Sequence, residues 1–303
     1  GTVLDDRAKS EHIRALEQLA ARDLPTDLME EVVTVAAKFA EEGAMPLVQK
    51  LARHPAPEVR AHLARAMYLD ADAELPGRRE LIVGLCGDGD VSVRAAAFGA
   101  CASLVEDPEV VRWVAACAAQ EPSPEVQSAC MSAIALGCNY GSTDLLFATY
   151  LDHAQRNPNA AVRQEIAGSL HWLPADPRLT RIVATLFADA SSDVRQSMAW
   201  QGNNMSEHPE LRDHFLQAAT QDPDESVRAD ALRGLHNFFP LPETVALLRQ
   251  RLAQDRNEST YWAALNAVEG HLPAKEARAL LQELTRAPFS SVAARAREVL
   301  ADE

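Results

Sequence analysis

The chain of 303 residues contains few aromatic residues and no long apolar stretch. Phenylalanine, tryptophan and tyrosine make up only 5% of it. No run approaches the roughly 18 apolar residues that a membrane-spanning helix needs. The N-terminal stretch also lacks the basic segment and apolar core of a secretory signal. We therefore expect no membrane association and a cytoplasmic location.

The sequence also lacks the short motifs that usually carry metal or nucleophile chemistry. Its five cysteines form no Cys-x-x-Cys pair and have no histidine nearby at metal-ligand spacing. They are Cys86, Cys101, Cys117, Cys130 and Cys138. Free cysteine packs as a small apolar residue, so buried thiols in a reducing compartment are expected. Gly-rich phosphate loops, Gly-x-Ser-x-Gly and His-Glu-x-x-His are absent as well, and we expect no catalytic residues, metal or cofactor.

Positive charge is scarce relative to negative charge. Lysine and arginine number 29 and aspartate and glutamate 44, which gives a net charge of −15. Affinity for nucleic acid comes chiefly from lysine and arginine, which displace counterions from phosphates. The acidic balance therefore argues against a nucleic-acid partner.

What the sequence does contain is a repeated phrase of about five residues with a central anchor. The anchors are Val59, Val93, Val126, Val162, Val194 and Val227, followed by degenerate copies at Thr260 and Val292. Successive anchors are 32 to 36 residues apart. Such regular spacing is typical of a solenoid, in which each repeat packs on its neighbours. The chain is therefore predicted to be one continuous array.

Each phrase is predicted to begin a helix. Six of the eight residues that lie three positions before the anchors can cap a helix start, namely Asp90, Ser123, Asn159, Ser191, Asp224 and Asn257. Apolar residues follow at helical spacing, as in Ile166, Leu170 and Leu173. Second amphipathic segments lie between the phrases, at 45–53, 79–86, 110–119, 179–188, 211–219, 245–253 and 277–285. Each repeat is thus predicted to be a helix pair, without strands.

The turn followed by Val-Arg-x-x-Ala resembles the short HEAT-like repeats, including the phycobilisome-lyase subgroup. The Thr-Pro-Leu-His phrase of ankyrin repeats and the tetratricopeptide pattern are absent. The resemblance covers roughly residues 44–302. It implies an all-α fold, a right-handed α-solenoid of about eight to nine helix pairs over 44–303. An N-terminal capping pair would occupy 1–43, with helices near 6–22 and 26–41.

The resemblance also implies a role for the arginine after each anchor. Arg60, Arg94, Arg163, Arg195 and Arg228 would bond turn aspartates of the same or a neighbouring repeat. Candidate partners are Asp88, Asp189 and Asp222. Dinuclear iron hydroxylases of this architecture use repeated His-Glu pairs, and this sequence has no His-Glu dipeptide. That activity is therefore excluded.

A candidate binding surface follows from helix geometry. In HEAT-like arrays the second helices line the inner curve, and the positions 2, 6 and 9 residues after the anchor lie opposite the buried face. In copies two and three these positions hold only small residues, Ala95, Gly99, Ala102, Ser128, Ser132 and Ala135. In copies four to seven they hold Gln164, Gly168, His171, Gln196, Trp200, Asn203, Ala229, Arg233, His236, Trp262, Asn266 and Glu269.

Tryptophan and arginine with polar neighbours are typical of binding hot spots. The candidate site therefore comprises His171, Trp200, Asn203, Arg233, His236, Trp262, Asn266 and Glu269. In the competing interpretation the tryptophans cover a seam between repeats and the histidines are polar lining. Amides outnumber carboxylates in this set, which disfavours a metal site.

These observations favour a non-enzymatic adaptor that binds a protein, peptide or small ligand in the concave groove. A HEAT-like alkyl-purine DNA glycosylase is an alternative, with Trp200, Trp262, Arg233 and Glu269 around a nucleotide. A bilin lyase or tetrapyrrole chaperone is another, and it depends on the repeat resemblance alone. An acidic toxin-neutralising protein also remains open. The sequence does not name the partner.

Overall fold

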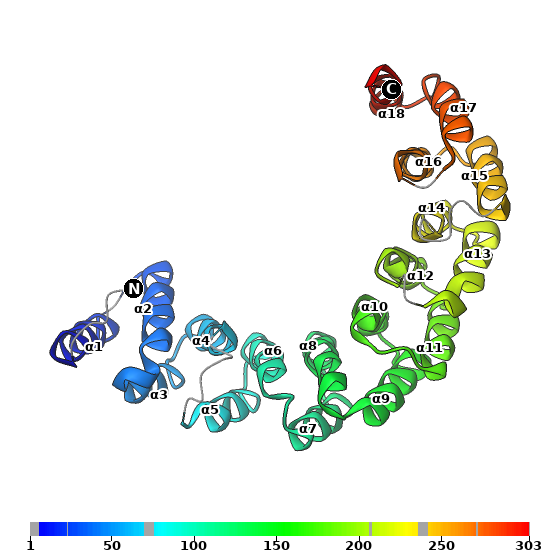
Figure 1. Ribbon diagram of the computed structural model, residues 1–303. Coiled ribbons are helices and arrows are strands. Elements are labelled where there is room, and N and C mark those ends of the chain that lie inside the picture. The colour runs from blue at the N-terminus through cyan, green and yellow to red at the C-terminus, as the bar shows by residue number, and fades with distance from the viewer. Residues whose placement is uncertain are drawn as a thin grey trace. The chain divides into compact units, whose positions relative to one another are not determined.

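The computed structural model describes residues 6–22, 24–69, 76–205, 208–235, 242–270 and 272–302. Over these residues it contains helices and no strands (Figure 1). The predicted all-α fold is therefore confirmed. The helices group into two compact units, the first unit Gly1–Thr149 and the second unit Tyr150–Glu303.

The first unit contains the helices up to α8 and the beginning of α9. Their bounds are α1 (Asp6–Ala20), α2 (Thr26–Lys38), α3 (Met45–Leu51), α4 (Pro57–Leu69), α5 (Arg78–Leu85), α6 (Val91–Ala100), α7 (Pro108–Ala118), α8 (Pro124–Ala135) and α9 (Thr143–Arg156), with short turns η1 (Ala40–Ala44), η2 (Cys101–Leu104) and η3 (Leu136–Tyr140). The two predicted N-terminal helices are present as α1 and α2. Their role as a cap stays a prediction.

The second unit continues with alternating first and second helices of the repeats. Their bounds are α10 (Ala160–Ser169), α11 (Pro177–Phe187), α12 (Ser192–Trp200), α13 (Arg212–Gln221), α14 (Glu225–Gly234), α15 (Pro242–Gln254), α16 (Glu258–Gly270), α17 (Ala274–Leu284) and α18 (Ser290–Asp302), with short turns η4 (Leu170–Trp172), η5 (Gln201–Asn204) and η6 (Pro209–Leu211). Every repeated phrase begins a helix, as predicted.

Within each unit the second helices of successive repeats form one row and the first helices another (Figure 1). In the first unit α4 packs on α6 and α6 on α8, and in the second unit α10, α12, α14 and α16 pack in the same succession. First helices of neighbouring repeats pack on each other much less closely. Within a unit, the more tightly packed row of second helices is therefore the inner side.

The core lies between the two rows and consists of the apolar positions that the repeat pattern predicts. In α10, Val162 and Ile166 are fully buried, and Leu170 continues their face into η4. Val59, Leu63 and Met67 occupy the same positions in α4 and are at most 2% exposed. Burying each such side chain contributes about 1.5 to 3 kcal/mol, so the repeated apolar face is the main stabilising element.

Helix capping only partly follows the prediction. The side chains of Asp90, Asn159 and Asp224 accept hydrogen bonds from the first turns of their helices, each from a backbone N–H 2.8 to 2.9 Å away. Ser123 and Ser191 make no such bond, so the predicted caps there are wrong. Their backbone N–H groups donate to acidic side chains two residues earlier, a bond that Asp90, Asn159 and Asp224 also make to the side chains two residues before them.

The arginine ladder is confirmed, and its partner lies in the following repeat. In the first unit Arg60 donates two hydrogen bonds to Asp88, at 2.7 and 2.8 Å. The corresponding pairs are Arg94 with Glu121, Arg163 with Asp189, Arg195 with Asp222, and Arg228 with Asp255. Each guanidinium also donates to a backbone carbonyl of its own turn. One side chain thus orders its own turn and joins two repeats.

Four of the cysteines lie in the first unit as free thiols, and Cys86, Cys101 and Cys130 are buried. The side chain of Cys138 lies outside the described residues. Burial raises the pKa of the Cys130 thiol well above its ordinary value, because the thiolate would lose its hydration. Over the described residues we find no group of three or more histidine, cysteine or acidic side chains that could hold a metal ion. Nor is any helix there both long and apolar enough to cross a bilayer.

Candidate functional site

The candidate site lies on the row of second helices in the second unit. Trp200, Asn266 and Glu269 are exposed, whereas His171, Arg233 and Trp262 are partly buried. His236 and the side chain of Asn203 lie outside the described residues. Two small residues at the same register, Ala135 and Ala229, are each 1% exposed. The predicted register is therefore wrong at these two alanines, which are small enough to be covered where second helices pack closely.

Trp200 and Arg233 form the one pair of the candidate set that the described structure brings into direct contact. The guanidinium carbon of Arg233 lies 4.5 Å from the centroid of the indole ring. A terminal nitrogen of Arg233 is 3.0 Å from Oδ1 of Asp230. The other carboxylate oxygen of Asp230 accepts a hydrogen bond from Nε2 of Gln196, at 2.9 Å. The four side chains thus form one network between α12 and α14.

Asp230 is the member of this network that the sequence analysis missed. Its side chain is 8% exposed, and burying a carboxylate without partners would be costly. Arg233 and Gln196 supply those partners. Asp230 lies three residues before Arg233 on the same helix, which is the spacing of an intrahelical ion pair. That spacing could have identified it from the sequence.

Two glycines allow α12 and α14 to approach closely enough for this contact. A Cβ atom on Gly202 would lie 2.5 Å from the Cα of Gly234 and 2.7 Å from a ring carbon of Phe215. A Cβ on Gly234 would lie 3.0 Å from the Cα of Gly202. The two distances at Gly202 are too short for any side chain, so that position needs glycine, and a side chain at Gly234 would force its neighbours to shift. The contact holds the turn that follows Trp200 against the end of α14, beside Arg233.

A recess with a volume of about 280 Å³ lies beside Trp200. Its lining residues come from α10, α12 with the start of η5, and α14: Gln164, Gly168, Asp193, Gln196, Ser197, Trp200, Gln201 and Asp230. Trp200 is 52% exposed, although Arg233 covers part of its ring. The recess therefore combines an aromatic wall, three amide side chains and two carboxylates.

Three other residues of the candidate set make contacts elsewhere. The indole N–H of Trp262 donates to Oε1 of Glu258, at 3.3 Å. Glu269 accepts a hydrogen bond from Nε of Arg295 on α18, at 3.0 Å. Nδ1 of His171 is 3.0 Å from the carbonyl oxygen of Gly168. These residues lie on the same row of helices but outside the network of Trp200.

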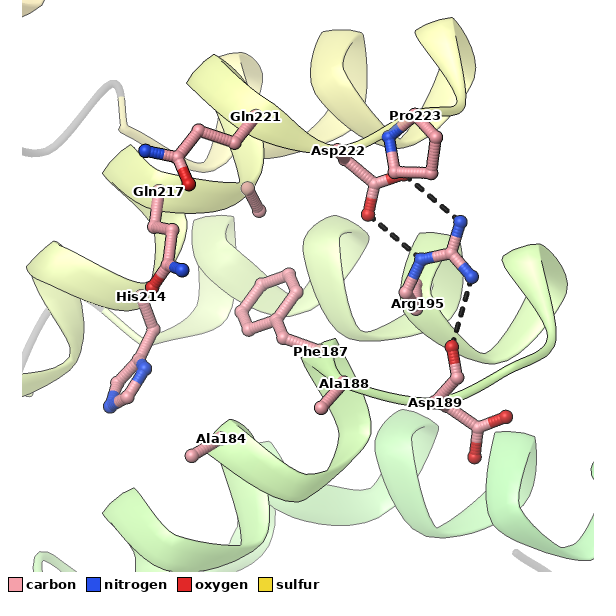
Figure 2. Close-up of a pocket in the computed structure, with 11 residues that line it drawn as sticks. Ala184, Phe187, Ala188, Asp189, Arg195, His214, Gln217, Gln221, Asp222 and Pro223 are labelled. Carbon is pink, nitrogen blue, oxygen red and sulfur yellow. Dashed lines mark hydrogen bonds and ion pairs between the residues drawn. The ribbon is translucent and has the colours of Figure 1, made fainter.

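A second cavity, of about 490 Å³, lies between α11 and α13 in the row of first helices (Figure 2). Phe187 and His214 line it, and Arg195 with Asp222 lies along one side. Arg195 uses its donors on both Asp222 oxygens and on the carbonyl oxygen of Asp189. No motif in the sequence predicts this cavity. The charged groups along this cavity are members of the arginine ladder and already bond to one another, so we do not assign a ligand to it.

Comparison with known proteins identifies the repeats. Residues 212–301 match the family model of HEAT repeats. Curated proteins gave no match. Among solved structures, the X-ray structure of YibA from Escherichia coli is similar, with a TM-score of 0.55, 17% identity, and coverage of 93% of this chain and 99% of that chain. Human deoxyhypusine hydroxylase in complex with glycerol gives a TM-score of 0.40 at 14% identity, covering 87% of this chain and 96% of that one.

The likeness to YibA extends over nearly the whole chain, and at this identity it concerns the fold alone. It agrees with the all-helical fold described above. The resemblance to HEAT-like repeats is therefore confirmed: the chain is an all-helical solenoid that carries HEAT repeats over residues 212–301.

Proposed function

We propose that this protein is a non-enzymatic adaptor that binds an extended segment of a partner protein along α10, α12 and α14. The Trp200–Arg233 pair is the anchor of this surface. The observation that carries the proposal is that Trp200 is half exposed and yet fixed by Arg233 and the network behind it. Leaving an indole in contact with water is unfavourable, whereas covering it with a partner gains free energy.

The geometry suits recognition of a protein segment in two ways. First, the anchor is already ordered, so binding costs little additional side-chain entropy. Second, Gln164 and Gln196 line the recess beside Trp200. Amide side chains both donate and accept hydrogen bonds, and can therefore pair with the N–H and C=O groups of an extended backbone. Aromatic and arginine anchors surrounded by polar groups are typical of protein interfaces.

The contacts of the charged residues favour an adaptor over the glycosylase alternative. That alternative places Arg233 and Glu269 around a nucleotide, with the carboxylate assisting. Arg233 pairs with Asp230, and Glu269 pairs with Arg295. The carboxylates in the recess would also repel a nucleic-acid backbone. Both features support a protein partner.

A selection from a random linear peptide library tests the proposal. Peptides enriched on the wild-type protein are measured by fluorescence anisotropy against Trp200→Ala and Arg233→Ala. A hot spot contributes about 2 kcal/mol or more, so Trp200→Ala should weaken binding by roughly 30-fold or more. Tyr68→Ala is the matched control, because Tyr68 is an aromatic residue of the first unit that is 43% exposed.

Tyr68→Ala should leave peptide affinity unchanged. The proposal fails if no enriched peptide depends on Trp200, or if both aromatic variants weaken binding equally. Circular dichroism of each variant shows whether the fold is intact before the affinities are compared.

A further inference from the structure

We infer that the recess beside Trp200 binds an arginine side chain of the partner segment. The inference rests on the proposed function and deepens it, because it names the chemistry of the segment that the adaptor would recognise. The partner would therefore be an extended segment that contains arginine.

The recess is lined by negative charge. The carboxylates of Asp193 and Asp230 line it, and no lysine or arginine is among its described lining residues. The nearest cation of the network, Arg233, lies 3.0 Å from Asp230 and is paired with it. Asp193 is exposed at the start of α12. A cation in the recess would therefore meet an uncovered carboxylate, and the protein's net charge of −15 would favour its approach.

The recess also has room for a long side chain and hydrogen-bond acceptors for its polar end. Gly168 leaves open space on the α10 side, since a Cβ there would meet no atom within 4 Å. That space suits the apolar stem of a long side chain. The amide oxygens of Gln164 and Gln196 are acceptors, and the indole of Trp200 forms a flat aromatic wall.

Arginine matches this combination better than lysine does. Its planar guanidinium presents five N–H donors, can bind a carboxylate with two parallel bonds, and stacks on aromatic faces. A lysine ammonium is a compact, strongly hydrated charge that does not stack in this way. Lysine and neutral side chains are therefore the competing occupants that the experiment must separate.

The experiment uses the peptides selected in the library experiment, fluorescein-labelled, and versions in which each arginine is replaced by lysine or by citrulline. Citrulline keeps the shape of arginine but carries no charge. We expect the selected peptides to contain arginine. Arginine-to-citrulline replacement should weaken binding at least tenfold, and arginine-to-lysine replacement should weaken it less.

On the protein side, Gly168→Leu fills the recess. Its matched control is Gly99→Leu, at the same repeat position in the first unit, where a Cβ also meets nothing within 4 Å. Gly168→Leu should weaken binding of arginine peptides at least tenfold, and Gly99→Leu should not change it. Asp193→Asn should weaken binding of the arginine peptides and should leave the affinity of their citrulline versions nearly unchanged.

The outcomes separate this inference from the proposed function. If Trp200-dependent peptides show no preference for arginine, or if Gly168→Leu binds them as tightly as the wild type, the inference is wrong and the adaptor function stands. A preference for lysine over arginine would also overturn it. If no peptide depends on Trp200, the proposed function itself is wrong.

Discussion

The second helices of the two units share the same scaffold but present different side chains. In the first unit the outward positions hold small residues, such as Ala95 and Ser132. In the second unit the equivalent positions hold Gln164, Trp200 and Arg233. The arginine ladder and the buried apolar positions recur in both units. The outward positions take part in neither the core nor the ladder, so the side chains that differ there are the candidates for binding a partner.

Glycine shows the same contrast. Gly99 in the first unit and Gly168 in the second lie where an added Cβ would meet no atom within 4 Å. Gly202 and Gly234 lie where two backbones approach each other and an added Cβ would collide. The same residue type therefore leaves open space at two positions and permits a close backbone approach at two others. Only the second use brings Arg233 beside Trp200.

The largest expected effect tests whether both units depend equally on the ladder. Arg60→Ala and Arg195→Ala each leave a carboxylate without its partner, and the side chains of Asp88 and Asp222 are only 13% and 5% exposed. Breaking a fully buried pair typically costs about 3 to 5 kcal/mol, and these pairs are partly buried, so we expect losses of up to about that size. Urea denaturation followed by circular dichroism should show losses of that size for both variants.

The control for the ladder is Arg112→Ala. Arg112 pairs with Glu109 in an exposed ion pair, with side chains 59% and 76% exposed. Exposed pairs contribute about 0 to 1 kcal/mol, so this variant should unfold close to the wild type. A large loss of stability for only one of Arg60→Ala and Arg195→Ala would show that the ladder stabilises one unit more than the other.

The next effect concerns the glycine contrast. Gly202→Ala would force apart two backbones, and overpacking of this kind typically costs about 1 to 3 kcal/mol. Gly168→Ala should be neutral or stabilise by about 0.5 to 1 kcal/mol, because alanine favours a helix over glycine. Thermal unfolding compares the two. Equal melting temperatures would contradict the close approach of α12 and α14.

The pH dependence of stability sharpens the comparison at Asp88 in the first unit. The hydrogen bonds from Arg60 hold the pKa of the Asp88 carboxyl below its ordinary value. A lowered folded-state pKa means that the pair stabilises fully above the unfolded-state pKa of about 3.9 and that this contribution is lost as pH falls further. The difference in urea midpoint between wild type and Arg60→Gln should therefore be full at pH 7 and smaller at pH 3.

The control for this prediction is Arg112→Gln, which should differ little from the wild type at either pH. A difference for Arg60→Gln that stayed constant from pH 7 to pH 3 would mean that the arginine acts mainly through the backbone carbonyls that it also contacts, those of His54 and Pro55.

The repeat spacing predicted the fold well because it follows from local rules. Apolar periodicity recurs in every copy, the arginine follows five of the six valine anchors up to Val227, and capping side chains occur in several copies, so all three support the same helix pair. The prediction was weaker where a repeat departs from the others. The longest interval, between Val126 and Val162, contains α9, a helix that the pattern did not single out. Gln127 replaces the ladder arginine at the start of that interval.

The candidate site was less predictable because it depends on contacts between repeats. Helical geometry placed Trp200 and Arg233 on one face, but it could not show that they touch. That contact depends on Gly202 and Gly234, which lie 32 positions apart in the sequence and look like ordinary helix-end glycines. The same limit explains Glu269, whose partner Arg295 lies in the next helix pair.

The smallest expected effect on stability is that of Trp200→Ala. It distinguishes an indole that forms a ligand-binding surface from one that covers the seam between two repeats. Trp200 is 52% exposed, so its removal should cost roughly 1 kcal/mol or less. Trp113 in the first unit offers the contrast, because it is partly buried and stacks on the buried ring of Phe98, with centroids 5.6 Å apart. A tryptophan packed in a core typically costs about 3 to 5 kcal/mol when truncated to alanine. Thermal denaturation should therefore show a much larger loss of stability for Trp113→Ala than for Trp200→Ala. A loss of more than about 3 kcal/mol for Trp200→Ala would mean that the indole is part of the packing between α12 and α14, and the surface would lose its anchor.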